Sequence, residues 1–155
     1  ANTVGASEFN HGYTYSGHPV AAAVALENLR ILEEEKVIEH VRDVAHPHLA
    51  KRWHALGDHP LVGETCLVGM MGSLSLVPEK NGSKVFAADE GTAGYTLREQ
   101  CFANNVIMRH VGDRMIIAPP LVITPDQIDV MIDRATLALD KAHAELTSKG
   151  LMKAA

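Results

Sequence analysis

The run from Phe9 to Pro19 constrains the start of the fold more than any other stretch of this 155-residue chain. Four hydroxyl-bearing side chains, Tyr13 to Ser16, lie between two glycines, and a proline follows at position 19. Proline suits the first position of a helix, where the backbone N–H that it lacks would have no helical partner. The start of a helix offers free N–H groups and partial positive charge, so this loop could bind an anion such as phosphate. A plain helix-capping loop has the same composition, and composition alone favours that simpler interpretation.

Helical spacing of apolar residues predicts two helical segments after this loop. Residues 19–35 are rich in alanine, which has the best intrinsic helix propensity. Residues 37–56 carry an apolar stripe at three- and four-residue steps, which would face a core. Pro47 lies inside the second segment and must kink or divide it near Ala45, because its nitrogen carries no hydrogen and its ring crowds the preceding turn.

The rest of the chain alternates strands and helices. Three apolar runs bounded by turn residues are interpreted as β-strands: 61–77, 106–111 and 115–118. Gly69 and Gly72 indicate a bulge or a close backbone approach in the first run, and residues 112–114 indicate a hairpin between the other two. A short helix over 97–104, with a start as early as residue 92, and a final helix capped by Thr124 complete the pattern. Two or three antiparallel strands with helices on one face make an α+β fold.

The composition argues against several kinds of partner. The formal net charge is −5 and no block of basic residues occurs, so neither nucleic acid nor an acidic membrane surface is expected. No apolar run reaches the length of a membrane span, and the N-terminus lacks the pattern of a secretory signal. The chain opens on Ala1 without an initiator methionine, which is compatible with a cut.

The cysteines and histidines do not form a metal-binding pattern. Cys66 and Cys101 are too few and too far apart for a disulfide framework or a zinc site, and two free thiols suit a reducing cytoplasm. Four histidines gather between positions 46 and 59, but no pair has HExxH spacing. We therefore expect no metal site, and we interpret Cys101 as a buried or semi-buried thiol.

The order of the residues in the first loop is more specific than its composition. The run from Phe9 to Pro19, followed by Val20-Ala21-Ala22-Ala23, resembles class III pyridoxal-phosphate aminotransferases, the ω-transaminases, and within them the amine:pyruvate and putrescine:pyruvate type. The resemblance runs from Phe9 to the end of the chain and covers only the C-terminal part of such an enzyme. It implies a fold type I protein, with residues 1–35 as the end of the large cofactor domain and its connecting helix, and 36–155 as the small domain. It also implies a homodimer or a dimer of dimers.

The same resemblance assigns cofactor roles to Tyr13 and Thr14. In the family the residue matching Thr14 binds the phosphate of pyridoxal 5'-phosphate across the dimer interface, in the active site of the neighbouring subunit. The residue matching Tyr13 lines that site. The alternative for Thr14 is that its hydroxyl merely satisfies the turn.

Arg109 is the candidate substrate-binding residue. It lies in an apolar strand, on the same face as Ile107 and Val111 by alternation, and a guanidinium matches a carboxylate with two parallel hydrogen bonds. From the residues alone, a strand-edge arginine that points to solvent is the simpler interpretation. The segment 105–121 again resembles the family, in which the matching arginine binds the carboxylate of an amino or keto acid and swings aside for amines.

The catalytic residues implied by the resemblance lie outside this chain. The lysine that holds the cofactor and the aspartate at its pyridine nitrogen belong upstream, and no lysine here occurs in the matching context. We expect the parent to move an amino group from an amine, with putrescine as one candidate, to pyruvate or a similar keto acid, and the 155-residue piece to be inactive alone. Alternatives are family relatives acting on ornithine, GABA or diaminopelargonate, amino-shifting mutases, and a non-catalytic α+β dimerisation or anion-binding module.

Overall fold

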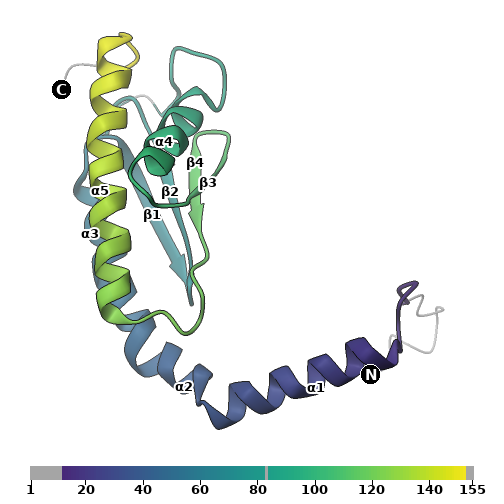
Figure 1. Ribbon diagram of the computed structural model, residues 1–155. Coiled ribbons are helices and arrows are strands. Elements are labelled where there is room, and N and C mark those ends of the chain that lie inside the picture. Colours follow the sequence, from purple (N-terminus) through teal and green to yellow (C-terminus); the bar gives the residue numbers. More distant parts are fainter. Residues whose placement is uncertain (1–11, 83, 153–155) are drawn as a thin grey trace, which may run out of the picture. The chain divides into compact units, whose positions relative to one another are not determined.

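The computed structural model describes residues 12–82 and 84–152 and divides the chain into two compact units between Lys36 and Val37 (Figure 1). The first unit contains helix α1, Pro19–Glu34, which confirms the predicted helix over 19–35. No residue of α1 is buried within this chain, although Val20, Val24 and Leu29 are apolar. The assignment of residues 1–35 and 36–155 to the large and small domains of a longer protein stays a prediction.

The second unit opens with a helix that Pro47 divides. Helix α2, Val37–His40, is followed by the π-helical turn η1, Val41–Ala45, and by α3, His46–Ala55. Across the π turn the N–H of His46 donates to the carbonyl of Val41, five residues back. The wider turn makes room for the proline ring, so the predicted division near Ala45 is confirmed. A single-turn 3-10 helix, η2, Leu56–Asp58, ends the segment.

Four antiparallel strands form one sheet in the order β1-β2-β4-β3. Their bounds are β1 Val62–Val68, β2 Met71–Leu76, β3 Arg109–Val111 and β4 Arg114–Ile117. The prediction of one strand over 61–77 was wrong, because a turn at Gly69 and Met70 folds this run into a hairpin. Gly69 has φ +56, a left-handed conformation that glycine adopts without strain. The hairpin predicted at 112–114 is confirmed.

Trp53 of α3 packs against the sheet where Gly72 leaves room for it. A Cβ on Gly72 would lie 2.8 Å from Cε2 of the indole, so only glycine allows this approach. The indole Nε1 also donates to the carbonyl of Cys66 at 3.0 Å. The close backbone approach predicted for this run is therefore confirmed at Gly72, whereas the bulge lies between Val62 and Glu64.

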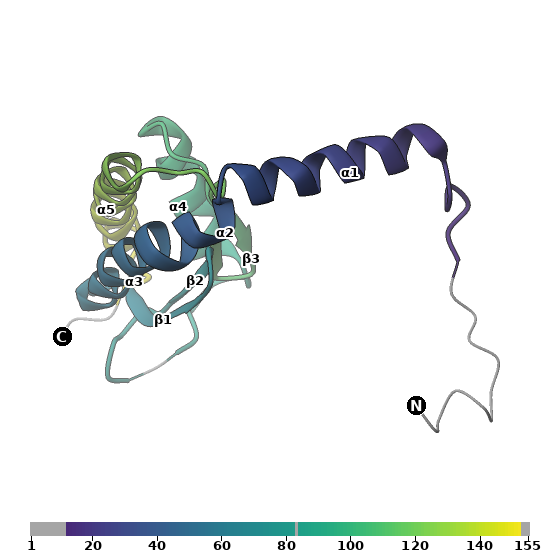
Figure 2. The same ribbon diagram turned by 90° about the horizontal axis from the view of Figure 1, so that it is seen from below.

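Helices α3, α4 and α5 cover one face of the sheet (Figures 1 and 2). Helix α4 spans Thr92–Ala103 and α5 spans Pro125–Ser148. Thr124 caps α5 as predicted, in a capping box in which its hydroxyl accepts from the N–H of Gln127 and the Gln127 side chain accepts from the N–H of Thr124. No helix among the described residues is both long and apolar enough to cross a membrane.

His59 joins the loop before β1 to helix α5 in its neutral form. Its Nδ1 accepts from the N–H of Leu61 at 3.1 Å, and its Nε2 lies 3.3 Å from the carboxylate of Asp140. The neighbouring His143 ring lies edge-on, with its centroid 5.8 Å away. Burial lowers the pKa of His59 despite the attraction of Asp140, and the charges of His143 and Lys80 act in the same direction as burial.

We therefore expect the protein to lose stability as the pH falls below the ordinary histidine pKa of about 6.5. In that range the unfolded chain takes up a proton at His59 that the folded chain resists, so acid favours unfolding. The variant His59→Asn, whose amide oxygen can still accept from Leu61, should lose less unfolding free energy than the wild type between about pH 7.5 and 5.5. Urea unfolding at the two pH values measures this difference, and equal pH slopes in the two proteins would contradict it.

Candidate functional site

Two consecutive turns precede α1 and hold the hydroxyl-bearing residues. The N–H of Ser16 donates to the carbonyl of Tyr13 at 2.9 Å, and the Ser16 hydroxyl accepts from the N–H of Tyr13 at 3.0 Å. The N–H of His18 then donates to the carbonyl of Tyr15 at 3.2 Å, and Gly17 between them has φ +77. Tyr13 and Thr14 therefore lie side by side in one tight turn. Residues 9–11 of the sequence motif lie outside the described residues.

Thr14 is free to bind a ligand within the part of the chain that the structure describes. Its side chain is exposed, and neither its hydroxyl nor its backbone N–H has a hydrogen-bond partner there. The backbone N–H of Tyr15 likewise has no hydrogen-bond partner among the described residues. The first turn of α1 contains no acidic side chain that would repel an anion. A hydroxyl and two N–H donors in one turn beside a helix start fit a phosphate group.

His18 is the residue of this loop whose role sequence reasoning missed. It is the N-cap of α1, and its side chain accepts from the N–H of Ala21. The signal was its position directly before Pro19, which occupies the first turn of the helix. Histidine is not among the residues usually found at this position.

Arg109 is the first residue of β3, which lies at the edge of the sheet, and belongs to the second unit. The predicted alternation is confirmed, because Ile107, Arg109 and Val111 are exposed whereas Met108 is buried. The side chain of Arg109 thus lies on the face of the sheet that the helices leave open. It forms no hydrogen bond or ion pair with any residue that the structure describes.

The residues in the cross-strand row of Arg109 on the open face are neutral, whereas the next row contains Arg114 and Glu64. Strand pairing places Ile116, Ser73 and Cys66 beside it, one on each successive strand. None of these side chains competes for the guanidinium. A carboxylate that approaches this face can therefore form two charge-assisted hydrogen bonds to Arg109.

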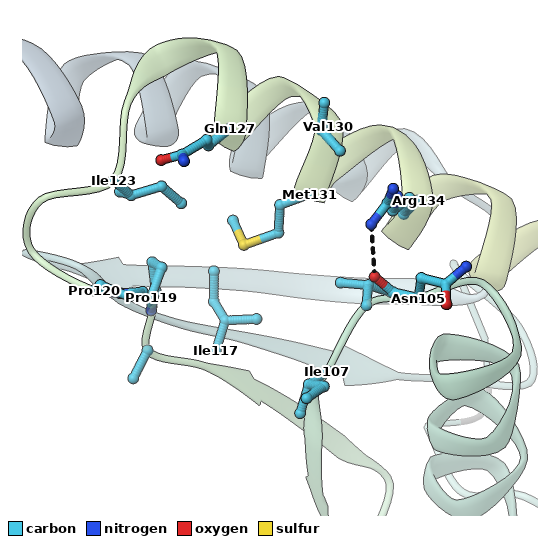
Figure 3. Close-up of a pocket in the computed structure, with 12 residues that line it drawn as sticks. Asn105, Ile107, Ile117, Pro119, Pro120, Ile123, Gln127, Val130, Met131 and Arg134 are labelled. Atoms are coloured by element: carbon cyan, nitrogen blue, oxygen red, sulfur yellow. Dashed lines mark hydrogen bonds between the residues drawn. The ribbon is translucent and has the colours of Figure 1, made fainter.

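A separate apolar cavity lies between α5 and the strand ends beside it (Figure 3). Its volume is about 430 Å³, and the side chains of Ile117, Ile123 and Met131 contribute to its lining. Arg134 at its margin donates to the carbonyl of Asn105 at 2.9 Å. Arg109 does not line this cavity, and the cavity contains no paired acid and base for catalysis.

The histidines and cysteines have structural surroundings. His46, His48 and His54 each hydrogen-bond within the second unit, to the Gly69 carbonyl, Asp129 and Thr65 respectively. Within residues 12–82 and 84–152, no group of three His, Cys, Asp or Glu side chains is placed to hold a metal ion. Burial raises the pKa of the Cys101 thiol to about 12, which confirms the interpretation of a buried thiol.

Comparisons with known proteins agree with this fold. Two solved structures superpose on most of the chain: a transaminase with L-ala, at a TM-score of 0.80 and 39% identity over 88% of this chain, and the ω-transaminase from Pseudomonas jessenii in complex with PMP, at 0.80 and 34% identity over 94%. This chain covers 32% and 31% of those chains. The sheet and its helices are therefore the C-terminal part of a fold type I transferase, as the sequence predicted.

The chain belongs to the class-III aminotransferases, whose family model matches residues 2–139. It is 58% identical over 137 residues to the putrescine–pyruvate aminotransferase of Pseudomonas aeruginosa, covering 88% of this chain. It is 36% identical over 144 residues to a probable mitochondrial γ-aminobutyrate transaminase 3 of Oryza sativa subsp. indica, covering 91% of this chain. The chain spans only 30% and 28% of the lengths of these relatives.

Proposed function

We propose that this chain is the C-terminal segment of a pyridoxal-phosphate-dependent ω-aminotransferase that moves an amino group from an amine to pyruvate or a similar keto acid. The observation that carries the proposal is an exposed turn at the start of α1 in which the hydroxyl and N–H of Thr14 have no partner among residues 12–82 and 84–152. The 58% identity to a putrescine–pyruvate aminotransferase supports this substrate class, with a diamine as a candidate donor.

Thr14 binds the cofactor phosphate in this proposal, and Tyr13 lines the same site. Pyridoxal phosphate supplies the electron sink for amino transfer, whereas these residues supply binding and orientation. The tight turn holds the backbone at Thr14 without help from a core, because hydrogen bonds between Tyr13 and Ser16 close the turn. The exposure of both residues in the isolated chain is what a contribution to a neighbouring subunit's site requires.

Arg109 binds the carboxylate of the keto acid in this proposal. The Arg109 guanidinium has no partner among the described residues, and it gains most when a carboxylate reaches it in a water-poor site. A diamine donor has no carboxylate, so with such a donor Arg109 discriminates between the two substrates of the reaction. A γ-aminobutyrate donor is a second candidate, favoured by the 36% identity to a γ-aminobutyrate transaminase.

No residue of this chain takes the catalytic role. The lysine that holds the cofactor belongs to the remaining part of the enzyme, which also provides most of the large domain. The working unit is therefore a longer polypeptide that assembles as a homodimer or a dimer of dimers. A non-catalytic α+β module for dimerisation or anion binding is the alternative, favoured by the absence of buried residues in α1.

We expect the purified 155-residue chain to catalyse no transamination, because the cofactor-holding lysine is missing. Mixing it with the remaining N-terminal part of a class-III aminotransferase should restore turnover and the visible absorbance of protein-bound cofactor. Amine consumption and pyruvate-dependent alanine formation measure the activity. Turnover by the purified chain alone would contradict the proposal, and failure of the mixture to bind cofactor would favour the non-catalytic module.

We expect Arg109→Met in the full-length enzyme to raise the KM for pyruvate by roughly ten- to hundred-fold, because two charge-assisted hydrogen bonds are lost. The KM for an amine donor without a carboxylate should stay within about two-fold, since such a donor does not need the guanidinium. Arg114→Met is the matched control. Arg114 lies on the same face of the sheet but in the next cross-strand row: it pairs with Val111, whereas Arg109 pairs with Ile116. Equal effects of the two substitutions on pyruvate would contradict the role of Arg109.

A further inference from the structure

His18 closes the start of α1 with three hydrogen bonds. Its Nδ1 accepts from the N–H of Ala21 at 3.4 Å, and its carbonyl accepts from the N–H of Ala22 at 3.0 Å. Its own N–H donates to the carbonyl of Tyr15 at 3.2 Å. The same residue therefore belongs both to the second loop turn and to the first helical turn.

These hydrogen bonds occupy most of the backbone N–H donors at the start of α1. A helix begins with four N–H groups that have no partner inside the helix. Here the N–H of His18 is bonded to the loop, Pro19 has none, and the N–H of Ala21 is bonded to the imidazole. Among the described residues, the N–H of Val20 is therefore the one donor at the start of α1 that remains unpaired and can bind a ligand.

A phosphate at this helix start must therefore take its other donors from the loop. Those donors are the Thr14 hydroxyl and the N–H groups of Thr14 and Tyr15. Their direction relative to α1 depends on the joint between loop and helix, which consists of Gly17, His18 and Pro19. Gly17 has φ +77, and a glycine does not restrain the backbone at this point. The hydrogen bonds of His18 therefore set the orientation of the loop relative to α1.

We infer that His18 is a positioning residue, which as the N-cap of α1 holds the Thr14 turn in the orientation that binds the cofactor phosphate. This inference rests on the proposed function. As the N-cap, His18 acts on the start of α1 through its acceptor Nδ1, which binds the N–H of Ala21. Loss of this cap should therefore weaken the binding of ligands that carry the phosphate group and leave other ligands unaffected. A general loss of stability would weaken the binding of both.

The test compares His18→Ala with His18→Asn in the full-length apoenzyme, using pyridoxal 5'-phosphate and pyridoxal as probes. Asparagine retains a side-chain acceptor for the Ala21 N–H, whereas alanine does not. We expect His18→Ala to raise the Kd for pyridoxal 5'-phosphate roughly five-fold, the size of a typical N-cap loss, and to leave the Kd for pyridoxal unchanged. His18→Asn should restore the Kd to within about two-fold of the wild type.

Thr14→Val in the same enzyme separates the phosphate-binding role of Thr14 from the positioning role of His18. If Thr14→Val weakens binding of pyridoxal 5'-phosphate and His18→Ala does not, the inference on His18 is wrong and the proposed function stands. If Thr14→Val leaves that Kd unchanged, the phosphate assignment in the proposed function is wrong. Equal weakening of both probes by His18→Ala would overturn the positioning role, as would an equal loss in His18→Asn. Should His18→Ala fail to fold, His18→Gln, whose acceptor stands one carbon further from the backbone, takes its place with the same expectations.

Discussion

The packing of one apolar sheet face against α3, α4 and α5 determines what the opposite face presents. Leu74 and Met115 are fully buried under these helices, and Trp53 reaches the sheet backbone at Gly72. Successive residues of a strand point to opposite faces, so burial of Met108 places Arg109 on the open side. A slip of one residue in β3 would bury the guanidinium and expose Met108. The hydrophobic core thus fixes the orientation of the substrate-binding candidate.

The loop before α1 is organised by a different principle. No residue of α1 is buried within this chain, so the core does not position Thr14. Short-range hydrogen bonds do so instead: Tyr13 and Ser16 bond to each other, and the N–H of His18 donates to the carbonyl of Tyr15. This suits a residue that is proposed to serve a neighbouring subunit, because a locally closed turn can keep its shape without contacts to a core of its own chain.

Local signals in the sequence predicted the features that depend on few residues. Pro47 marked the division of the helix, Thr124 marked the start of α5, and alternation placed Arg109 with Ile107 and Val111. The hairpin at Gly69 was missed because apolar residues continue through its turn, which hides the break between β1 and β2. The cap formed by His18 was missed because it depends on rotamer and distance. The assignment of Tyr13, Thr14 and Arg109 came from resemblance to a family, and it stays a prediction.

The central claim is that Thr14 acts in the active site of the neighbouring subunit, and subunit complementation tests it most directly. One full-length variant carries Thr14→Val, and the other lacks the cofactor-holding lysine of the N-terminal part. The two are unfolded, mixed, refolded together and assayed at limiting cofactor. If Thr14 acts across the interface, mixed dimers contain one intact site, and random mixing recovers about a quarter of wild-type activity. If Thr14 serves its own subunit, no mixed dimer contains an intact site, and activity no higher than that of the separate variants would contradict the account.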